Sequence, residues 1–282
     1  MTTTPLVSTE WLAARLGDAN VRVLDGSYHL PAAKRDAAAE FAAAHVPGAS
    51  FFDIEAVSDH SNTLPHMLPA ADAFAEAVGA MGIDNQTHVV VYDAYGLMSA
   101  ARVWWMFRIF GHEQVSVLDG GYPKWTKEAR PTQSGTPTVA ARRFKATLRP
   151  ELVRAKSDLV ANLGANAVQV IDARAAARFA GTAPEPRAGL RSGHIPGSKN
   201  LPFTQLLDPA TGTVLPPLDL ARQFAAAGID STKPIVASCG SGVTACVLAL
   251  GLHILGAKDV AIYDGSWSEW GLEGGPPVAT GP

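Results

Sequence analysis

The sequence predicts an α/β protein built from two similar domains, each with a mainly parallel sheet flanked by helices. Two observations lead to this prediction. Short runs rich in valine and isoleucine alternate with stretches of helical periodicity, and the same phrases occur twice in the same order. Strands that alternate with helices are typical of parallel sheets covered on both faces. Repetition over about half the chain indicates duplicated domains and not a solenoid of short repeats.

The duplication is visible in four phrases that return in the second half at offsets between 145 and 149 residues. The matched phrases begin at Val21 and Val168, at His45 and His194, at Val89 and Ile235, and at Leu118 and Tyr263. One pair of matched positions differs in a way that matters: Asp93 stands where the second half has Cys239. The two halves therefore share a fold but are not expected to share chemistry.

The elements follow in order from the patterning. Runs with few polar residues indicate strands buried on both faces, and amphipathic stretches indicate helices. Strands are predicted over Val21–Leu24, His88–Tyr92, Val115–Leu118, Val168–Ile171, Pro234–Ala237 and Val260–Tyr263. Helices are predicted over Ser8–Leu16, Ala70–Met81, Ser99–Phe110, Lys156–Leu163, Leu218–Ala227 and Thr244–Leu255.

A segment rich in threonine, proline, serine and glycine, Thr132 to Thr138, separates the halves and is typical of a linker. We expect a first domain over residues 1–138, a linker and crossover over 139–151, and a second domain over 152–282.

Composition excludes several classes of protein. An apolar fraction of 47% with 17% charged residues fits a folded chain, and a net charge of −3 gives no reason to expect nucleic acid or a membrane as partner. The N-terminus lacks the pattern of a signal peptide. Two cysteines cannot form a disulfide framework, so a reducing, cytoplasmic compartment is expected. No phosphate-binding glycine motif and no metal-ligand spacing occurs, so no metal or cofactor is expected.

The most informative segment begins at Cys239 and reads Cys-Gly-Ser-Gly-Val-Thr, between a predicted buried strand and a predicted helix. In such a loop, successive backbone N–H groups can point inward, and the positive end of the helix dipole lies behind them. Both features favour an anionic sulfur over a thiol. The alternative is a buried, inert cysteine. Cys246 receives the opposite interpretation: it lies on the predicted helix and is expected to be core, with a redox partnership to Cys239 as the alternative.

With these residues in view, the chain resembles the two-domain rhodanese-type sulfurtransferases over nearly its whole length. In that family only the C-terminal domain keeps the cysteine, as here. The loop with neutral residues after the cysteine resembles that of members that use 3-mercaptopyruvate. The resemblance implies that Cys239 takes up a sulfane sulfur as a persulfide and passes it to a thiol, such as thioredoxin, or to cyanide. Backbone groups of Gly240, Gly242, Val243 and Thr244 would support that sulfur.

Two arginines carry a second part of the resemblance. Arg178 and Arg187 lie in a segment similar to the one that binds the carboxylate and keto group of mercaptopyruvate in this family. A guanidinium matches a carboxylate in geometry and charge. The alternative is that both are loop arginines, solvated or paired with Glu185.

The family resemblance also implies a proton relay for Ser241. The matching candidates from the first domain are His45 and Asp36. Ser241 could instead satisfy the local backbone. His45 faces a stronger alternative, because His194 occupies the same phrase of the second half, which indicates a structural role.

Three other functions would fit part of the sequence. A thiosulfate sulfurtransferase would use the same cysteine, but the neutral Gly240 and Ser241 offer a sulfonate little to bind. A cysteine phosphatase would need an arginine six residues after the cysteine, where Ala245 stands. A non-catalytic binding module would not need Cys239 at all.

Overall fold

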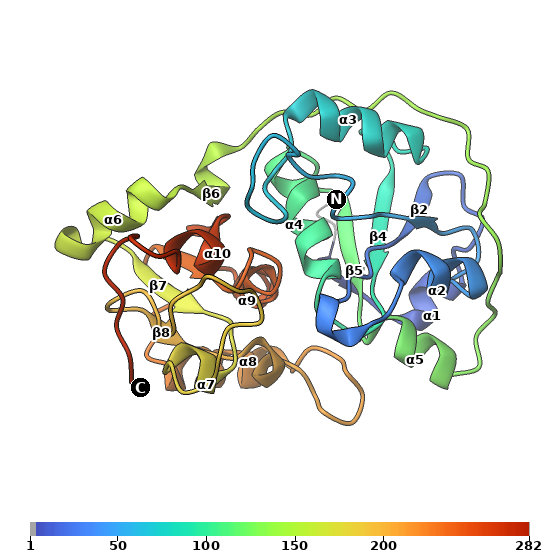
Figure 1. Cartoon of the computed structure of the whole chain (residues 1–282). Helices are drawn as coiled ribbons and strands as arrows, with labels where there is room; N and C mark the ends of the chain where they lie inside the picture. Colours follow the sequence, from blue (N-terminus) through green and yellow to red (C-terminus); the bar gives the residue numbers. More distant parts are fainter. Residues whose placement is uncertain (1–3, 282) are drawn as a thin grey trace. The chain divides into compact units, whose positions relative to one another are not determined.

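The computed structural model describes residues 4–281, which form two compact units (Figure 1). Each unit takes most of its chain from one half of the sequence, but each also includes a short segment from the other half. Unit 1 holds the chain up to Asp59, Leu68–Arg149 and Asp208–Val214, and unit 2 holds His60–Met67, Pro150–Leu207 and the chain from Leu215 onward.

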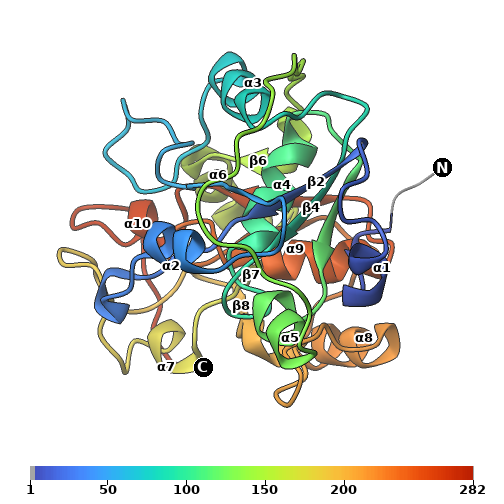
Figure 2. The ribbon, with the colours of Figure 1, turned by 90° about the vertical axis from the view of Figure 1, so that its right-hand side faces the viewer.

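Unit 1 contains a five-stranded sheet with the order β1-β5-β4-β2-β3, and every pair is parallel. Its strands are β1 (Leu6–Val7), β2 (Val21–Asp25), β3 (Ser50–Phe51), β4 (His88–Tyr92) and β5 (Val115–Leu118). Its helices are α1 (Thr9–Ala13), α2 (Ala37–Ala43), α3 (Ala71–Ala80), α4 (Ala100–Ile109) and α5 (Gly121–Lys127). The neighbouring strands β2 and β4 run side by side through the middle of this sheet (Figure 2).

Unit 2 repeats this arrangement with the order β6-β10-β9-β7-β8, again all parallel. Its strands are β6 (Val153–Arg154), β7 (Gln169–Asp172), β8 (Lys199–Asn200), β9 (Ile235–Ser238) and β10 (Val260–Tyr263). Its helices are α6 (Lys156–Ala165), α7 (Ala176–Phe179), α8 (Pro217–Ala226), α9 (Ala245–Ile254) and α10 (Ser266–Trp270).

The predicted fold class is confirmed, and all six predicted strands are present within one residue at either end. The largest difference in a helix is at α1, which ends at Ala13 and not at Leu16 because the chain continues in turns. The sequence patterns did not predict the two-residue strands or the short helices α2, α5, α7 and α10. Elements of this length contain too few residues to show a period.

Alternate residues of the central strands in unit 1 pack against different helices, as expected for a sheet covered on both faces. Val23, Val90 and Tyr92 join a core with Leu12 of α1 and Trp125 of α5. The helix α4 also contacts β4 and β5, and its Phe107 and Phe110 rings pack against Phe74 of α3. These two packed layers explain why the strands read as continuous apolar runs.

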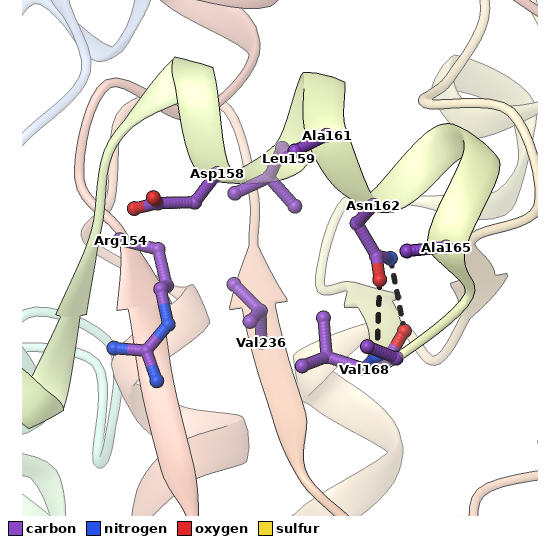
Figure 3. Close-up of a pocket in the computed structure, with 9 residues that line it drawn as sticks. Arg154, Asp158, Leu159, Ala161, Asn162, Ala165, Val168 and Val236 are labelled. Carbon is purple, nitrogen blue, oxygen red and sulfur yellow. Dashed lines mark hydrogen bonds between the residues drawn. The ribbon is translucent and has the colours of Figure 1, made fainter.

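In unit 2, Val236 of β9 packs with Leu159 of α6 and Trp267 of α10. A half-open depression of about 160 Å³ lies beside this cluster, between α6 and the sheet (Figure 3). Small side chains such as Ala161 and Ala165 line it and leave it unfilled.

Residues 132–149, which include the segment with linker composition and most of the expected crossover, follow the surface of unit 1. The backbone N–H of Gln133 bonds to His45 O at 2.9 Å, that of Arg142 to Gly79 O at 2.8 Å, and that of Arg149 to Ile109 O at 2.7 Å. Extended chain can form such bonds whatever its composition. Unit 1 therefore continues to Arg149.

Candidate active site

Cys239 follows β9 directly, and the loop after it leads into the buried helix α9. The turn needs a left-handed residue, which Gly242 supplies with φ +73°. Only 2% of Cys239 is exposed. The sulfur is therefore held at the carboxyl end of the sheet, beside the N-terminus of a helix, in a place where little water reaches it.

The start of α10 holds the outer side of this loop. Trp267 donates its backbone N–H to Cys239 O at 3.0 Å, and Ser268 donates both its N–H and its hydroxyl to Gly240 O at 2.8 and 2.7 Å. The N–H of Cys239 donates to Ser266 Oγ at 3.1 Å. These bonds hold the carbonyl groups of Cys239 and Gly240 toward α10.

The N–H groups on the inner side are open. The backbone N–H groups of four loop residues form no hydrogen bond with any acceptor in residues 4–281. These residues are Gly240, Ser241, Val243 and Thr244. Buried N–H groups nearly always find a partner, so a cluster without one indicates an anion-binding position.

Arg178, at the end of α7, lies against the cysteine loop. Its Nη2 is 3.1 Å from where a Cβ on Gly240 would lie, so any side chain at this position would press on the guanidinium. Glu185 accepts from Arg178 Nε at 3.2 Å and from its Nη2 at 2.5 Å. The structure thus brings one of the two predicted arginines to the loop, and pairs it with Glu185 at the same time.

Arg187 has a different environment. Its Nη2 lies 3.3 Å from Nε2 of His66, and because a guanidinium has no acceptor, the imidazole nitrogen must accept. No carboxylate among residues 4–281 forms an ion pair with Arg187. Its positive charge is therefore available to an anionic ligand.

His66 is a site residue that sequence reasoning missed. It is buried, with 2% exposed, and it lies in the segment His60–Met67 that packs with unit 2 although its neighbours in sequence belong to unit 1. No local pattern marks it, because only the tertiary fold brings it to Arg187.

The two residues expected to form a relay with Ser241 have structural contacts in unit 1. His45 is fully buried, donates from Nδ1 to Phe41 O at 2.7 Å and stacks on the Phe41 ring at 4.1 Å. His194 makes the same two contacts with Phe179, at 2.9 and 3.8 Å. A contact repeated in both units is most simply a feature of the fold.

Asp36 is exposed and caps α2 by accepting the Ala39 N–H at 3.0 Å. The relay of Ser241 with His45 and Asp36 remains a prediction, and these contacts do not favour it.

Both cysteines are free thiols. Cys246 is fully buried on α9 and donates to Gly242 O at 3.2 Å, so its side chain supports the loop from below. Among residues 4–281, no three His, Cys, Asp or Glu side chains are grouped to hold a metal ion. None of the helices in that range has the length and apolarity that crossing a bilayer requires.

Comparison with known proteins identifies the family to which this two-unit architecture belongs. A family model of the rhodanese-like domain matches residues 8–128 and again residues 155–273. The chain belongs to the rhodanese family. The two matched segments correspond to the sequence repeat, and the second one contains the rhodanese loop at Cys239.

Relatives within the rhodanese family carry two kinds of name. The 3-mercaptopyruvate sulfurtransferase of Rattus norvegicus is 47% identical over 96% of this chain and 93% of its own length. The thiosulfate sulfurtransferase of Bos taurus is 48% identical over 94% of this chain and 91% of its own length. The crystal structure of SseA from Escherichia coli, a 3-mercaptopyruvate sulfotransferase with the rhodanese fold, has a TM-score of 0.86 at 41% identity. That alignment covers 95% of this chain and all of SseA.

Proposed function

We propose that this rhodanese is a 3-mercaptopyruvate sulfurtransferase that carries sulfur on Cys239. The observation that carries the proposal is the open N–H loop around Cys239 with the guanidinium of Arg178 directly against it. Because relatives named for either donor are equally similar, overall identity does not choose between mercaptopyruvate and thiosulfate. The proposal for mercaptopyruvate therefore rests on the residues at the site.

Those residues fit an α-keto acid. Arg187 offers an unpaired positive charge to the carboxylate, and Arg178 offers its remaining N–H groups to the keto oxygen or the carboxylate. The residues that follow the cysteine are neutral, so the doubly charged thiosulfate would find no cation on the loop itself. Thiosulfate is therefore the second candidate donor.

In the first half-reaction, the Cys239 thiolate attacks the sulfur of 3-mercaptopyruvate. A sulfur–sulfur bond forms, the carbon–sulfur bond breaks, and its electron pair leaves with the carbon as pyruvate enolate. The thiol proton of the donor then converts the enolate to pyruvate, and we assign its transfer to the Ser241 hydroxyl. The N–H groups of Gly240, Ser241, Val243 and Thr244 stabilise the persulfide anion that remains.

In the second half-reaction, a thiolate acceptor or cyanide attacks the outer sulfur, and the Cys239 thiolate leaves. A dithiol protein such as thioredoxin has the chemistry to accept the sulfur. Since the cycle needs Cys239 reduced at each turn and both cysteines are free thiols, we assign the protein to a reducing, cytoplasmic compartment.

The test is kcat/KM for 3-mercaptopyruvate and for thiosulfate, each with cyanide as acceptor, on one preparation. We expect a preference for mercaptopyruvate of about a hundredfold or more, which corresponds to about 2.7 kcal/mol of transition-state binding. A preference for thiosulfate would leave the rhodanese chemistry but overturn the assignment of the donor.

A further inference from the structure

A buried ionic network lies beneath the candidate site, and its centre is Arg174, two residues after β7. The side chain of Arg174 is only 1% exposed. Its Nε and Nη2 hold the Asp172 carboxylate, with the shortest contact at 2.6 Å, and its Nη2 also donates to Gly193 O at 2.8 Å. Burial opposes the charge of Arg174, but the carboxylates of Asp172 and Glu185 raise its pKa. The group is a fixed cation.

The same arginine holds Glu185. Arg174 Nη1 donates to Glu185 Oε1 at 2.8 Å, and the Glu185 side chain is only 2% exposed. The other contacts of this carboxylate are those to Nε and Nη2 of Arg178. Glu185 thus binds one guanidinium on each side, and it occupies the Nε edge of Arg178. The Nη1 end of Arg178 is what remains for a ligand.

Arg174 also reaches the cysteine loop. Its guanidinium lies over the Trp267 ring at 4.3 Å, a favourable cation–π distance. The backbone N–H of Trp267 is the group that holds Cys239 O. One buried side chain therefore supports both the arginine that faces the donor and the loop that carries the nucleophile.

The charges in the network balance, because the carboxylates of Asp172 and Glu185 face the guanidinium groups of Arg174 and Arg178. Arg187 stands outside this balance. The two arginines predicted to bind the donor therefore differ. Arg187 supplies net charge, whereas Arg178 supplies direction.

We propose that Glu185, anchored by Arg174, is a positioning residue that fixes the direction in which Arg178 meets the sulfur donor. This deepens the proposed function, since it requires Arg178 to bind the donor. This role of Glu185 predicts two opposite effects of a single substitution. Removing the negative charge of Glu185 makes the site more attractive to anions in general, yet makes it worse at using its own anionic donor.

The test is Glu185→Gln, measured in two ways. The first is alkylation of Cys239 by iodoacetate and by iodoacetamide, followed on the Cys239 peptide. We expect the ratio of the two rates, anion over neutral reagent, to rise about 3- to 10-fold, because a charge next to Arg178 is lost. The iodoacetamide rate should stay within about twofold. The second is kcat/KM for mercaptopyruvate, which should fall about 10- to 100-fold as Arg178 loses its charged anchor.

A double-mutant cycle adds a direct check of the route. In an Arg178→Gln background, Glu185→Gln should lower kcat/KM less than about threefold, because the residue it positions is gone. Asp158→Asn is the matched control, since its carboxylate caps the N-terminus of α6 by accepting the Ala155 N–H at 2.8 Å. It should change neither measurement.

Several results would overturn the proposal. An unchanged alkylation ratio would mean that Glu185 does not balance Arg178. An unchanged or higher kcat/KM would mean that it does not position Arg178. Equal slowing of both alkylating reagents would mean that the loop has collapsed and that the role is only structural. Alkylation needs no sulfur donor, so a wrong assignment of the donor would show separately, in the wild-type kinetics.

Discussion

The loops that begin at Asp93 in unit 1 and at Cys239 in unit 2 occupy the same place in the same fold. In both, the backbone carbonyl of the first residue accepts an N–H from the helix after the last central strand: Tyr122 donates to Asp93 O and Trp267 to Cys239 O, each at 3.0 Å. The scaffold around the two side chains is thus the same, and the difference between the loops lies in the side chains themselves.

In unit 1 the carboxylate fills its own loop. Asp93 accepts the backbone N–H of Tyr95 at 2.8 Å, of Met98 at 2.7 Å and of Ala100 at 2.8 Å, and it is fully buried. In unit 2 the matching N–H groups of Ser241 and Thr244 have no acceptor within the described chain, whereas the N–H of Cys246, the counterpart of Ala100, bonds to Val243 O at 3.2 Å. Unit 1 therefore shows, within the same molecule, that the N–H groups of such a loop bind carboxyl oxygens, although burial raises the pKa of Asp93 and the N–H bonds only partly offset this. In unit 2 we propose that the sulfur of Cys239 takes this position.

A second difference concerns the residue two places after the matched strands. Ser27 and Arg174 both donate their N–H to the preceding aspartate at 2.9 Å, so the turn is the same. In unit 1 the short Ser27 side chain stays within its own loop, where its hydroxyl accepts the Ala94 N–H at 2.9 Å. In unit 2 the longer Arg174 side chain builds the network that reaches Arg178. Duplication kept the backbone, and single side chains separated a closed unit from a reactive one.

The strongest test of this comparison is to introduce a carboxylate into the loop of unit 2, at the position that matches Asp93. Cys239→Asp should lower sulfur transfer at least about a thousandfold, because the nucleophile is lost. It should also raise hydrogen-exchange protection of the N–H groups in residues 241–245, as the new carboxylate accepts them.

Cys239→Ser is the control. It should be equally inactive but should not gain protection. If the aspartate variant gains no protection over the serine variant, the two loops are not equivalent.

The next largest effect is expected in unit 1. Asp93→Asn turns an amide NH₂ toward backbone donors and should destabilise unit 1 by about 2–3 kcal/mol. Thermal unfolding combined with hydrogen exchange in residues 88–118 measures this. Asp119→Asn, where one N–H from Val214 is at stake at 2.8 Å, should cost about 1 kcal/mol. Equal costs for the two variants would contradict the idea of an anion-filled loop.

Arg187 tests the same contrast at the donor. Arg187→Ala should raise KM for mercaptopyruvate about 10- to 100-fold, because it removes the charge that no carboxylate balances. The loss with thiosulfate should be several-fold smaller. Equal losses with both donors in steady-state kinetics would remove this arginine from the recognition of the keto acid.

The smallest effect is expected at Glu128, at the end of α5. This is the helix whose Tyr122 N–H donates to Asp93 O. Glu128 joins α5 to α1: it accepts from Lys124 Nζ and from the Thr9 hydroxyl, both at 2.5 Å, and Arg130 lies 2.6 Å away. Hydrogen bonds from Lys124 and then Thr9 lower the pKa of Glu128 from 4.5 to about 2.

Because this pKa is lowered on folding, the stabilisation is complete above pH 4.5 and is lost as the pH falls toward 2. With solvent screening it amounts to about 1 kcal/mol. Urea unfolding at pH 6 and at pH 2.5 should show that Glu128→Gln removes this part of the acid sensitivity. Glu76→Gln on α3 should not, and an equal effect of the two variants would contradict the account.

Much of this fold could be predicted because the central strands are buried on both faces and therefore appear, in both halves, as short runs with few polar residues. The cysteine loop was predictable for a similar reason, since Cys239 and two glycines fall between a strand and a helix. The predicted arginines were found through a family likeness, and their spacing alone would not have paired Arg178 with the loop.

Other features depend on contacts that no sequence pattern encodes. His66 reaches Arg187 through a segment that leaves its own half of the chain, and Arg174 acts through a carboxylate eleven residues away in sequence. The relay role of His45, which the family resemblance implied, stays a prediction. Its imidazole stacks on Phe41 and binds a carbonyl, as its counterpart does in unit 2, which is the structural role that the repeated phrase indicated.

The most direct test of the account is the intact mass of the protein after treatment with 3-mercaptopyruvate and no acceptor. We predict a gain of one sulfur atom per chain, located on the Cys239 peptide, removed by cyanide and absent from Cys239→Ser. A chain that turns over the donor without holding this sulfur, or that holds it on Cys246, would contradict the claim that the open loop of unit 2 is the sulfur carrier.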